Sequence, residues 1–231
     1  MKLTVQDIAR IFSLSEKTIY RWINQGDIPA YKINEQYRFN RTEIIEWATA
    51  RRINFSPELF EEPEMEGGQI RSLSDSLDAG GVFYRVSGKS KDEVIREMVK
   101  IIRIPENVDP EFLYRVLMAR EKMGSTAVGE GIAIPHARMP LVLHVSRPSV
   151  SLCFLEEPVE FGALDGKPVF ALFTIISPTI RSHLYLLARL SYLLRNDEFK
   201  EILCKQGSRS AIVDTIRNLE SNLDNAVANV K

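Results

Sequence analysis

A histidine that follows a proline at the end of a short apolar run is the residue of this sequence best suited to chemistry. Residues 131–137 read Gly-Ile-Ala-Ile-Pro-His-Ala. Because proline cannot donate to a sheet ladder, we expect a buried strand to end at Pro135. The small Ala137 leaves room beside the next ring. We therefore expect the imidazole of His136 to be exposed at the rim of a sheet, where a large partner can reach it.

This placement favours nucleophilic transfer of a group to a ring nitrogen. Neutral imidazole is a competent nucleophile near neutral pH. Phosphoryl transfer needs fixed positioning, an in-line approach and positive charge beside the equatorial oxygens. Arg120 offers a planar cationic fork for those oxygens, and Gly124, Ser125 and Thr126 offer backbone N–H groups or hydroxyls. The three histidines of the sequence show no metal-ligand spacing, so we expect no metal or other cofactor.

Residues 120–137 closely resemble the type-2 enzyme IIA domain of the bacterial phosphoenolpyruvate phosphotransferase system, in its fructose, mannitol and nitrogen-regulatory branch. They read Arg-Glu-Lys-Met-Gly-Ser-Thr-Ala-Val-Gly-Glu-Gly-Ile-Ala-Ile-Pro-His-Ala, and the likeness covers residues 70–221, including Ser182-His183-Leu184. The resemblance implies that His136 accepts a phosphoryl group from an HPr-like phosphohistidine carrier protein. It also implies that His183 is the second active-site histidine and Arg120 the active-site arginine. Such a domain is a phosphocarrier rather than a turnover enzyme.

These residues also have structural interpretations. Arg120 near the end of a helix could satisfy terminal carbonyl groups instead of a phosphate. His183 could be an N-terminal helix residue without a chemical role. His144 has no supporting motif, and we take it as structural.

The elements around the motif alternate between helix and strand. We expect helices to open at Ser90 and at Asp109-Pro110, because serine or aspartate caps a helix and proline suits its first position. Residues 149–155 and 169–177 are apolar runs typical of buried strands, and 183–194, 197–205 and 210–219 follow as helices. The pattern predicts a layered α/β domain with a mixed sheet flanked by helices.

Residues 1–56 predict a winged helix-turn-helix. Thr4-x-x-Asp7 and Ser15 cap two short helices, and Asn40-x-x-Glu43 opens a third. Residues 30–33 and 37–40 lie between them as a hairpin. The second helix would enter the major groove of DNA, with the hairpin as a wing over the backbone or minor groove. The candidate DNA contacts are Lys17, Thr18, Tyr20 and Arg21 on the helix and Lys32, Gln36, Tyr37 and Arg38 on the wing.

Positive charge is concentrated in this N-terminal part. Residues 1–56 hold nine Lys and Arg against six Asp and Glu, a net charge of +3, whereas the whole chain carries −1. A local basic patch suits phosphate contacts, although a helical adaptor with a solvated basic face fits the same count. Residues 2–51 resemble the excisionase/MerR-like helix-turn-helix family, for example in Thr18-Ile19-Tyr20-Arg21-Trp22 and Tyr37-Arg38-Phe39. This resemblance implies double-stranded DNA as a partner.

Residues 57–69 separate the two parts. They hold five glutamates among prolines and glycines, a composition that predicts an extended, self-repelling linker. We therefore expect a DNA-binding domain at 1–56, an acidic linker at 57–69 and a IIA domain at 70–225.

Composition indicates a cytoplasmic protein. Hydrophobic residues make up 45% and charged residues 26% of the chain, as in ordinary globular proteins. The two cysteines form no Cys-x-x-Cys pair, which favours a reducing compartment. The apolar run at 170–176 is too short to span a bilayer, and the first residues lack the apolar core of a signal peptide. We therefore expect no membrane insertion.

Together, these observations predict a phosphorylation-responsive transcriptional regulator of the nitrogen-regulatory IIA type, acting as a dimer on paired half-sites. A second hypothesis is a IIA component that passes phosphate to a transporter's IIB domain, with the N-terminal part as a protein adaptor. A third is a DNA-binding protein with a vestigial sensor. Specific DNA binding would support the first hypothesis, and loss of phosphate to an acceptor domain would support the second. Absence of phosphate labelling would support the third.

Overall fold

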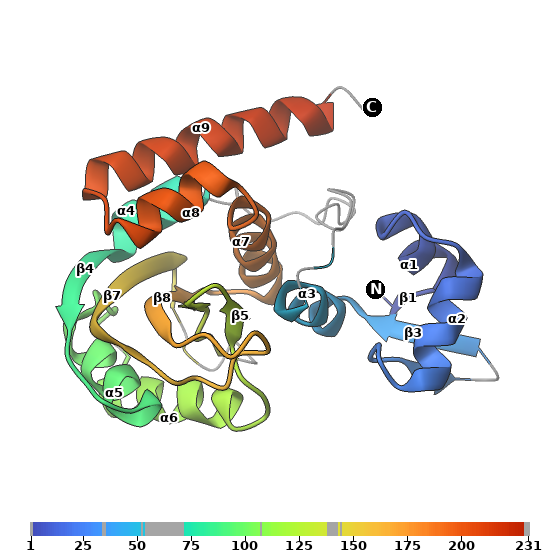
Figure 1. Ribbon diagram of the computed structural model, residues 1–231, viewed down its shortest axis with the longest axis horizontal. Coiled ribbons are helices and arrows are strands. Elements are labelled where there is room, and N and C mark those ends of the chain that lie inside the picture. The colour runs from blue at the N-terminus through green and yellow to red at the C-terminus, as the bar shows by residue number, and fades with distance from the viewer. Residues whose placement is uncertain are drawn as a thin grey trace. The chain divides into compact units, whose positions relative to one another are not determined.

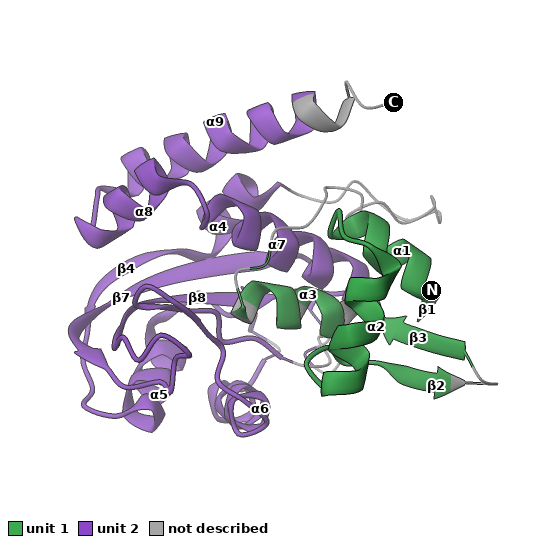
Figure 2. Cartoon of the chain, turned by 45° about the vertical axis from the view of Figure 1, so that its right-hand side comes forward, with its two compact units in different colours: residues 1–68 green, residues 69–231 purple. Residues whose placement is uncertain are grey.

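The computed structural model of this protein describes residues 2–33, 36–51, 53, 72–106, 108–137, 143 and 145–228. The chain divides into two compact units, Met1–Gly68 and Gln69–Lys231, which Figure 2 distinguishes by colour. The acidic linker expected at 57–69 and the side chain of His144 lie outside the described residues.

The first unit is a helix-turn-helix with a small antiparallel sheet. Its elements are β1 (Lys2–Leu3), α1 (Val5–Ile11), α2 (Glu16–Gln25), β2 (Tyr31–Ile33), β3 (Gln36–Asn40) and α3 (Arg41–Ala50). Strand β3 lies between β1 and β2 and pairs antiparallel with both. The β2–β3 hairpin is the wing that the sequence predicts (Figure 2).

The predicted caps of α1 and α2 are confirmed. Thr4 and Asp7 form a reciprocal capping box at the start of α1, and the Ser15 hydroxyl accepts from the backbone N–H of Thr18 at the start of α2. The Thr4 N–H and hydroxyl both donate to Asp7, which lowers the pKa of that carboxyl below its ordinary value. Gly26 ends α2 in the left-handed conformation, with φ of 70°.

The second unit is an α/β domain around a mixed sheet. Its elements are α4 (Leu73–Gly80), β4 (Gly81–Val86), α5 (Lys91–Ile101), α6 (Pro110–Glu121), β5 (Ala127–Gly129), β6 (Ile132–Ala133), β7 (Ser149–Val159), β8 (Val169–Ile176), α7 (Ile180–Leu193), α8 (Asp197–Cys204) and α9 (Arg209–Ala228). Within the described residues, the strands follow the order β4-β7-β8-β6-β5. Strand β8 runs antiparallel to β7 and parallel to β6. The predicted mixed sheet is therefore confirmed.

Helices cover both faces of this sheet. Figure 1 shows α5 and α6 on one face and α4, α7, α8 and α9 on the other. Alternate side chains of β8 serve the two layers: the Thr174 hydroxyl lies 2.8 Å from Met98 Sδ of α5, whereas the rings of Phe173 and Phe199 of α8 lie 6.5 Å apart between centroids. Because side chains alternate along a strand, this pair defines an α5 face and an α7–α8 face of β8.

Several elements differ from the sequence expectation. Helix α7 opens at Ile180 and not at residue 183, because Thr179 and Ser182 form a capping box there. Strand β7 continues to Val159, beyond the expected end at residue 155. Helix α4 and strand β4 were not predicted. The caps expected at Ser90 and at Asp109-Pro110 are confirmed.

Candidate functional site

His136 lies beside the central strand of the larger sheet. It follows β6 by three residues and makes a parallel bridge with Ile175 of β8. The β5–β6 hairpin that precedes it is held to β8 through the carbonyl oxygen of Gly131, which accepts from Phe170 N–H at 2.7 Å. Gly131 has φ of 77°, and a Cβ there would meet the Phe170 ring at 2.5 Å, so this turn requires glycine.

The His136 ring has a defined hydrogen bond. Its Nδ1 lies 2.6 Å from the carbonyl oxygen of Ile134. A carbonyl oxygen can only accept, so Nδ1 carries the hydrogen and donates it. In the neutral ring, the lone pair therefore resides on Nε2. This tautomer makes Nε2 the nucleophilic atom.

The expectation that His136 is exposed is wrong. The residue exposes 3% of its surface. The sequence argument assumed that the chain leaves the sheet at Pro135. Instead the backbone stays beside β8, as the bridge to Ile175 shows, and the ring turns back toward Ile134.

His183 lies against His136, as the predicted pairing requires. The two ring centroids are 5.1 Å apart with an interplanar angle of 40°. His183 is in the first turns of α7, where its N–H donates to Thr179 O, and it exposes 1% of its surface. The site therefore consists of two enclosed imidazoles from elements far apart in the sequence.

The other predicted phosphate ligands lie in the last turn of α6 and in the loop after it. Arg120 Nη1 donates to Gly124 O at 2.9 Å, the kind of carbonyl contact expected of a basic residue at a helix end. The Ser125 hydroxyl donates to Phe161 O at 2.7 Å, and the Thr126 hydroxyl donates to Glu121 at 2.6 Å. Both hydroxyl protons thus have acceptors within the protein, and phosphate contact by these residues stays a prediction.

The sequence analysis missed Glu121, a buried carboxylate that organises this loop. It accepts from Thr126 N–H at 2.9 Å and from Lys91 Nζ at 2.8 Å. Thr126 O in turn accepts from Ile134 N–H at 3.0 Å, and Ile134 O holds the His136 ring. A chain of hydrogen bonds thus connects Glu121 to the orientation of His136. The signal available in the sequence was a Glu-to-Thr spacing of five residues across a glycine, which no general motif describes.

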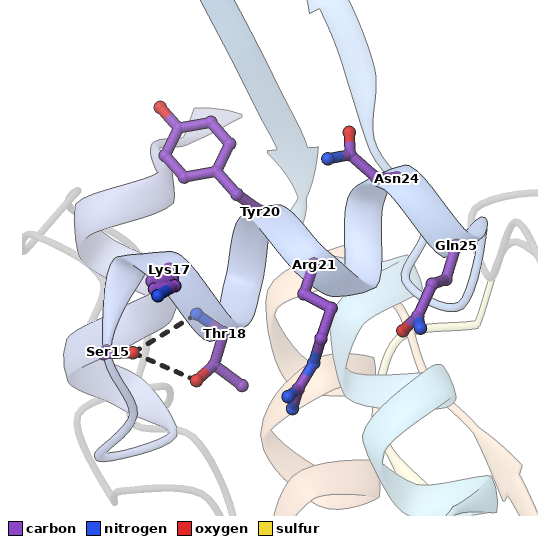
Figure 3. A pocket seen from close by; sticks show the side chains of 7 residues that line it. All are labelled: Ser15, Lys17, Thr18, Tyr20, Arg21, Asn24 and Gln25. Atoms are coloured by element: carbon purple, nitrogen blue, oxygen red, sulfur yellow. Dashed lines mark hydrogen bonds between the residues drawn. The ribbon is translucent and has the colours of Figure 1, made fainter.

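The predicted DNA-contacting residues of α2 share one exposed surface. Lys17, Thr18, Tyr20 and Arg21 line a hollow together with Ser15, Asn24 and Gln25 (Figure 3). The Thr18 hydroxyl lies 3.0 Å from the capping hydroxyl of Ser15, so the Thr18 side chain takes part in the N-terminal cap of α2. Asn24 and Gln25 are exposed residues of this surface that the sequence analysis did not name. Figure 3 shows Arg21 and Gln25 on one flank of the helix and Tyr20 and Asn24 on the other.

The predicted wing residues lie on the β2–β3 hairpin. Lys32 of β2 is exposed and pairs with Tyr37 of β3. The Tyr37 ring meets Tyr20 edge-on, with centroids 6.1 Å apart, and so joins the wing to α2. Arg38 donates to the Gln36 side chain and, at 3.0 Å, to Tyr37 O.

The described residues hold neither a candidate metal centre nor a candidate membrane-spanning helix. No group of three or more His, Cys, Asp and Glu side chains among them could hold a metal ion. In the part of the chain that the structure describes, no helix is both long enough and apolar enough to cross a membrane.

The fold and the paired histidines define a two-part protein, a helix-turn-helix unit followed by a IIA-type α/β domain. The chain belongs to the phosphoenolpyruvate-dependent sugar phosphotransferase system EIIA 2 family, whose model matches residues 75–219. A helix-turn-helix domain model matches residues 3–52. Both resemblances drawn from the sequence are therefore confirmed.

Known relatives match more than half of this chain. A nitrogen regulatory protein of Pseudomonas aeruginosa is 31% identical over 153 residues, which cover 64% of this chain and 97% of the relative. The fructose-specific EIIABC component of the PTS system of Bacillus subtilis is 32% identical over 147 residues, which cover 62% of this chain and 23% of that protein. The crystal structure of nitrogen regulatory protein IIA-Ntr from Neisseria meningitidis aligns with a TM-score of 0.52 at 28% identity, over 58% of this chain and 91% of that one.

Proposed function

We propose that this chain is a cytoplasmic, phosphorylation-responsive transcriptional regulator. His136 accepts a phosphoryl group from an HPr-like phosphohistidine carrier protein. The charge state of the IIA domain then biases the binding of duplex DNA, or of a regulatory partner, by the helix-turn-helix unit. The match to nitrogen regulatory proteins over nearly their whole length supports the regulatory branch of the family.

The observation that carries the phosphoacceptor role is the hydrogen bond from His136 Nδ1 to Ile134 O. It directs the lone pair to Nε2. Transfer then forms a P–N bond at Nε2 as the P–N bond to the donor's imidazole breaks, and the donor ring leaves with the electron pair of that bond. The Nδ1 hydrogen stays in place, and the donor ring, which carries a hydrogen on its other nitrogen, leaves as a neutral imidazole, so the step moves no proton. Because both partners are imidazoles, the free-energy change of the transfer is close to zero and the step is reversible.

In this proposal His183 stabilises the transferred group. With its ring centroid 5.1 Å from that of His136, it is close enough to donate to a phosphoryl oxygen on Nε2. A preorganised donor in a site shielded from water stabilises developing charge more strongly than the same donor in solvent. Arg120 supplies the remaining positive charge in this proposal.

Burial of the site adds a requirement to the mechanism. In-line attack needs the donor's phosphorus within reach of Nε2, whereas His136 exposes 3% of its surface. Groups that cover the ring must therefore move before transfer. Acceptance of phosphate is coupled to a conformational opening, which suits a switch.

In this proposal the helix-turn-helix unit binds the DNA. Its exposed α2 surface carries Lys17 and Arg21, and the wing carries Lys32. Phosphorylation adds about −1.5 to −2 charges to the chain, and DNA binding is governed by charge. One small unit seldom supplies enough contacts, so we expect two chains on paired half-sites.

The test uses the general phosphotransferase proteins and radiolabelled phosphoenolpyruvate, with the wild-type chain and His136→Ala. We expect acid-labile label on the wild type alone, and label retained on His136→Ala would remove this residue from the mechanism. A gel shift on selected duplex DNA, with and without the donor, tests the output. Rapid loss of label to a IIB domain without specific DNA binding would instead favour a transport relay, and no label at all would favour a vestigial sensor.

A further inference from the structure

Ser177 is a fully buried hydroxyl at the end of β8. It exposes 0% of its surface, and among the residues that the structure describes its Oγ has no hydrogen-bond partner. Nearly all buried polar groups in folded proteins are paired, because an unpaired one loses its hydration without compensation. A buried hydroxyl without a partner therefore calls for an explanation, such as a ligand that supplies the missing acceptor.

The strand geometry places this hydroxyl on the same face as the histidine pair. Thr174 points to the α5 layer and Phe173 to the α8 layer. Side chains alternate along a strand, so Ile175 and Ser177 continue the α7–α8 face. Ile175 is also the residue that bridges to His136 in parallel register.

His136 uses the same face. Residues paired directly across two parallel strands point to the same side of the sheet, and the His136 ring meets His183 of α7, which covers that side. Ser177 directly follows the last residue of β8 and is two residues beyond Ile175, about 7 Å further at the rise of an extended chain. The chain from Ser177 then leads within three residues to the start of α7, whose N-terminal dipole favours a negative group.

We propose that Ser177 is a phosphoryl-binding residue of this site, its hydroxyl donating a hydrogen bond to an equatorial oxygen of the group carried on His136 Nε2. This inference rests on the proposed function and adds a phosphoryl-binding residue that neither sequence motif includes. The unpaired hydroxyl of the dephosphorylated chain is the donor that the phosphorylated state needs. No bond of Ser177 forms or breaks covalently, because it only binds the oxygen.

The test compares Ser177→Ala with Thr174→Val in the full-length chain. Both variants remove one buried hydroxyl from β8, but Thr174 faces α5 and donates to Met98, away from the histidines. The rate of label transfer from a phosphorylated HPr-like carrier and the thermal midpoint of each variant are measured.

We expect Ser177→Ala to melt at the wild-type temperature or above, since it loses no partner, and to carry its label on His136. We expect its transfer rate to fall about 10-fold or more, because a hydrogen bond to a charged group is lost. Thr174→Val should transfer at the wild-type rate. Ser177→Cys keeps the volume of the side chain but donates hydrogen bonds weakly. Its transfer rate should lie between those of Ser177→Ala and the wild type.

Other outcomes overturn the proposal. Transfer by Ser177→Ala at the wild-type rate, or an equal loss of rate in Thr174→Val, would assign Ser177 no part in phosphoryl binding while leaving the function of His136 intact. If Ser177→Ala fails to fold, wild-type transfer by a folded Ser177→Cys has the same meaning. Absence of label on the wild-type chain would instead overturn the proposed function, and this inference with it.

Discussion

The imidazoles of His136 and His183 meet with their ring centroids 5.1 Å apart and their planes inclined by 40°. One ring follows the short strand β6 and the other belongs to α7. The hydrogen bond from Nδ1 to Ile134 O fixes the tautomer of His136. In the proposed transfer the two rings therefore have different roles. His136 is the nucleophile, and His183 donates a hydrogen bond to the transferred phosphoryl group.

Replacing His183 by alanine should separate these parts. We expect His183→Ala to keep acid-labile label on His136 while the rate of transfer falls by about 10²-fold, as when one preorganised donor to a developing charge is removed. The measurement is a rapid-quench time course with the phosphorylated carrier protein. His183→Gln keeps an N–H donor and should recover part of the rate. Complete loss of labelling in both variants would place the phosphoryl acceptor on His183 itself.

The sequence identified the chemistry of this site better than its exposure. The run at 131–137 pointed to His136, and the resemblance pointed to His183, because local residue types carry that information. Exposure of the ring depended on whether the chain leaves β8 after Pro135, and the bridge to Ile175 decides this question. Such a pairing between distant segments has no signature in the local sequence.

A similar distinction applies to the fold. The caps at Thr4, Ser15 and Ser90 were predictable because each depends on two residues within one turn. Helix α4 was missed because it is short and buries two serines and a glycine beside two leucines, so that no apolar stripe stands out. Its first N–H groups are satisfied by Glu220, which accepts from Leu73 N–H at 2.7 Å from far along the chain.

Glu121→Gln should loosen the loop that leads to His136. Glu121 is buried and accepts from Thr126 N–H, the Thr126 hydroxyl and Lys91 Nζ. A glutamine has one acceptor oxygen, so its NH2 group would face a donor. We expect a loss of about 2–4 kcal/mol in the local stability of this segment, measured as faster amide hydrogen exchange at Thr126 and Ile134.

The control for this charge removal is Glu156→Gln. Glu156 pairs with Arg85 on the surface, where the two side chains are 48% and 82% exposed. Exposed ion pairs contribute little to stability, so exchange at Thr126 should not change in this variant. Equal exchange rates in Glu121→Gln and the wild type would show that the buried carboxylate does not hold the loop.

The exposed residues of α2 and the wing should affect DNA binding differently. Arg21 projects from the surface of α2 that also carries Asn24 and Gln25 (Figure 3). Arginine reads guanine through two hydrogen bonds, and asparagine or glutamine reads adenine. On a duplex selected from a random pool, Arg21→Ala should cost about 1–3 kcal/mol and relax the preference at one base pair.

Lys32→Ala is the matched change on the wing. We expect it to weaken binding to all duplexes alike and to reduce the salt dependence of log K by about one unit, as for loss of one phosphate contact. The measurement is a fluorescence anisotropy titration at several salt concentrations. Unchanged sequence preference in Arg21→Ala would assign base readout to other residues of the unit.

The two cysteines should differ sharply in reactivity toward alkylating reagents. Cys153 lies fully buried on β7, and burial raises the pKa of its thiol to about 12, whereas Cys204 at the end of α8 is exposed. The thiolate is the reactive form, so iodoacetamide at pH 8 should modify Cys204 alone until the protein unfolds. Because the folded state keeps the Cys153 proton above the ordinary thiol pKa while the unfolded state releases it, stability should also fall as the pH rises above about 9. Cys204→Ser isolates the buried thiol, and mass spectrometry of the alkylated chain reads the result. Rapid modification of Cys153 in folded Cys204→Ser protein would mean that the sheet opens at β7 far more readily than its packing implies.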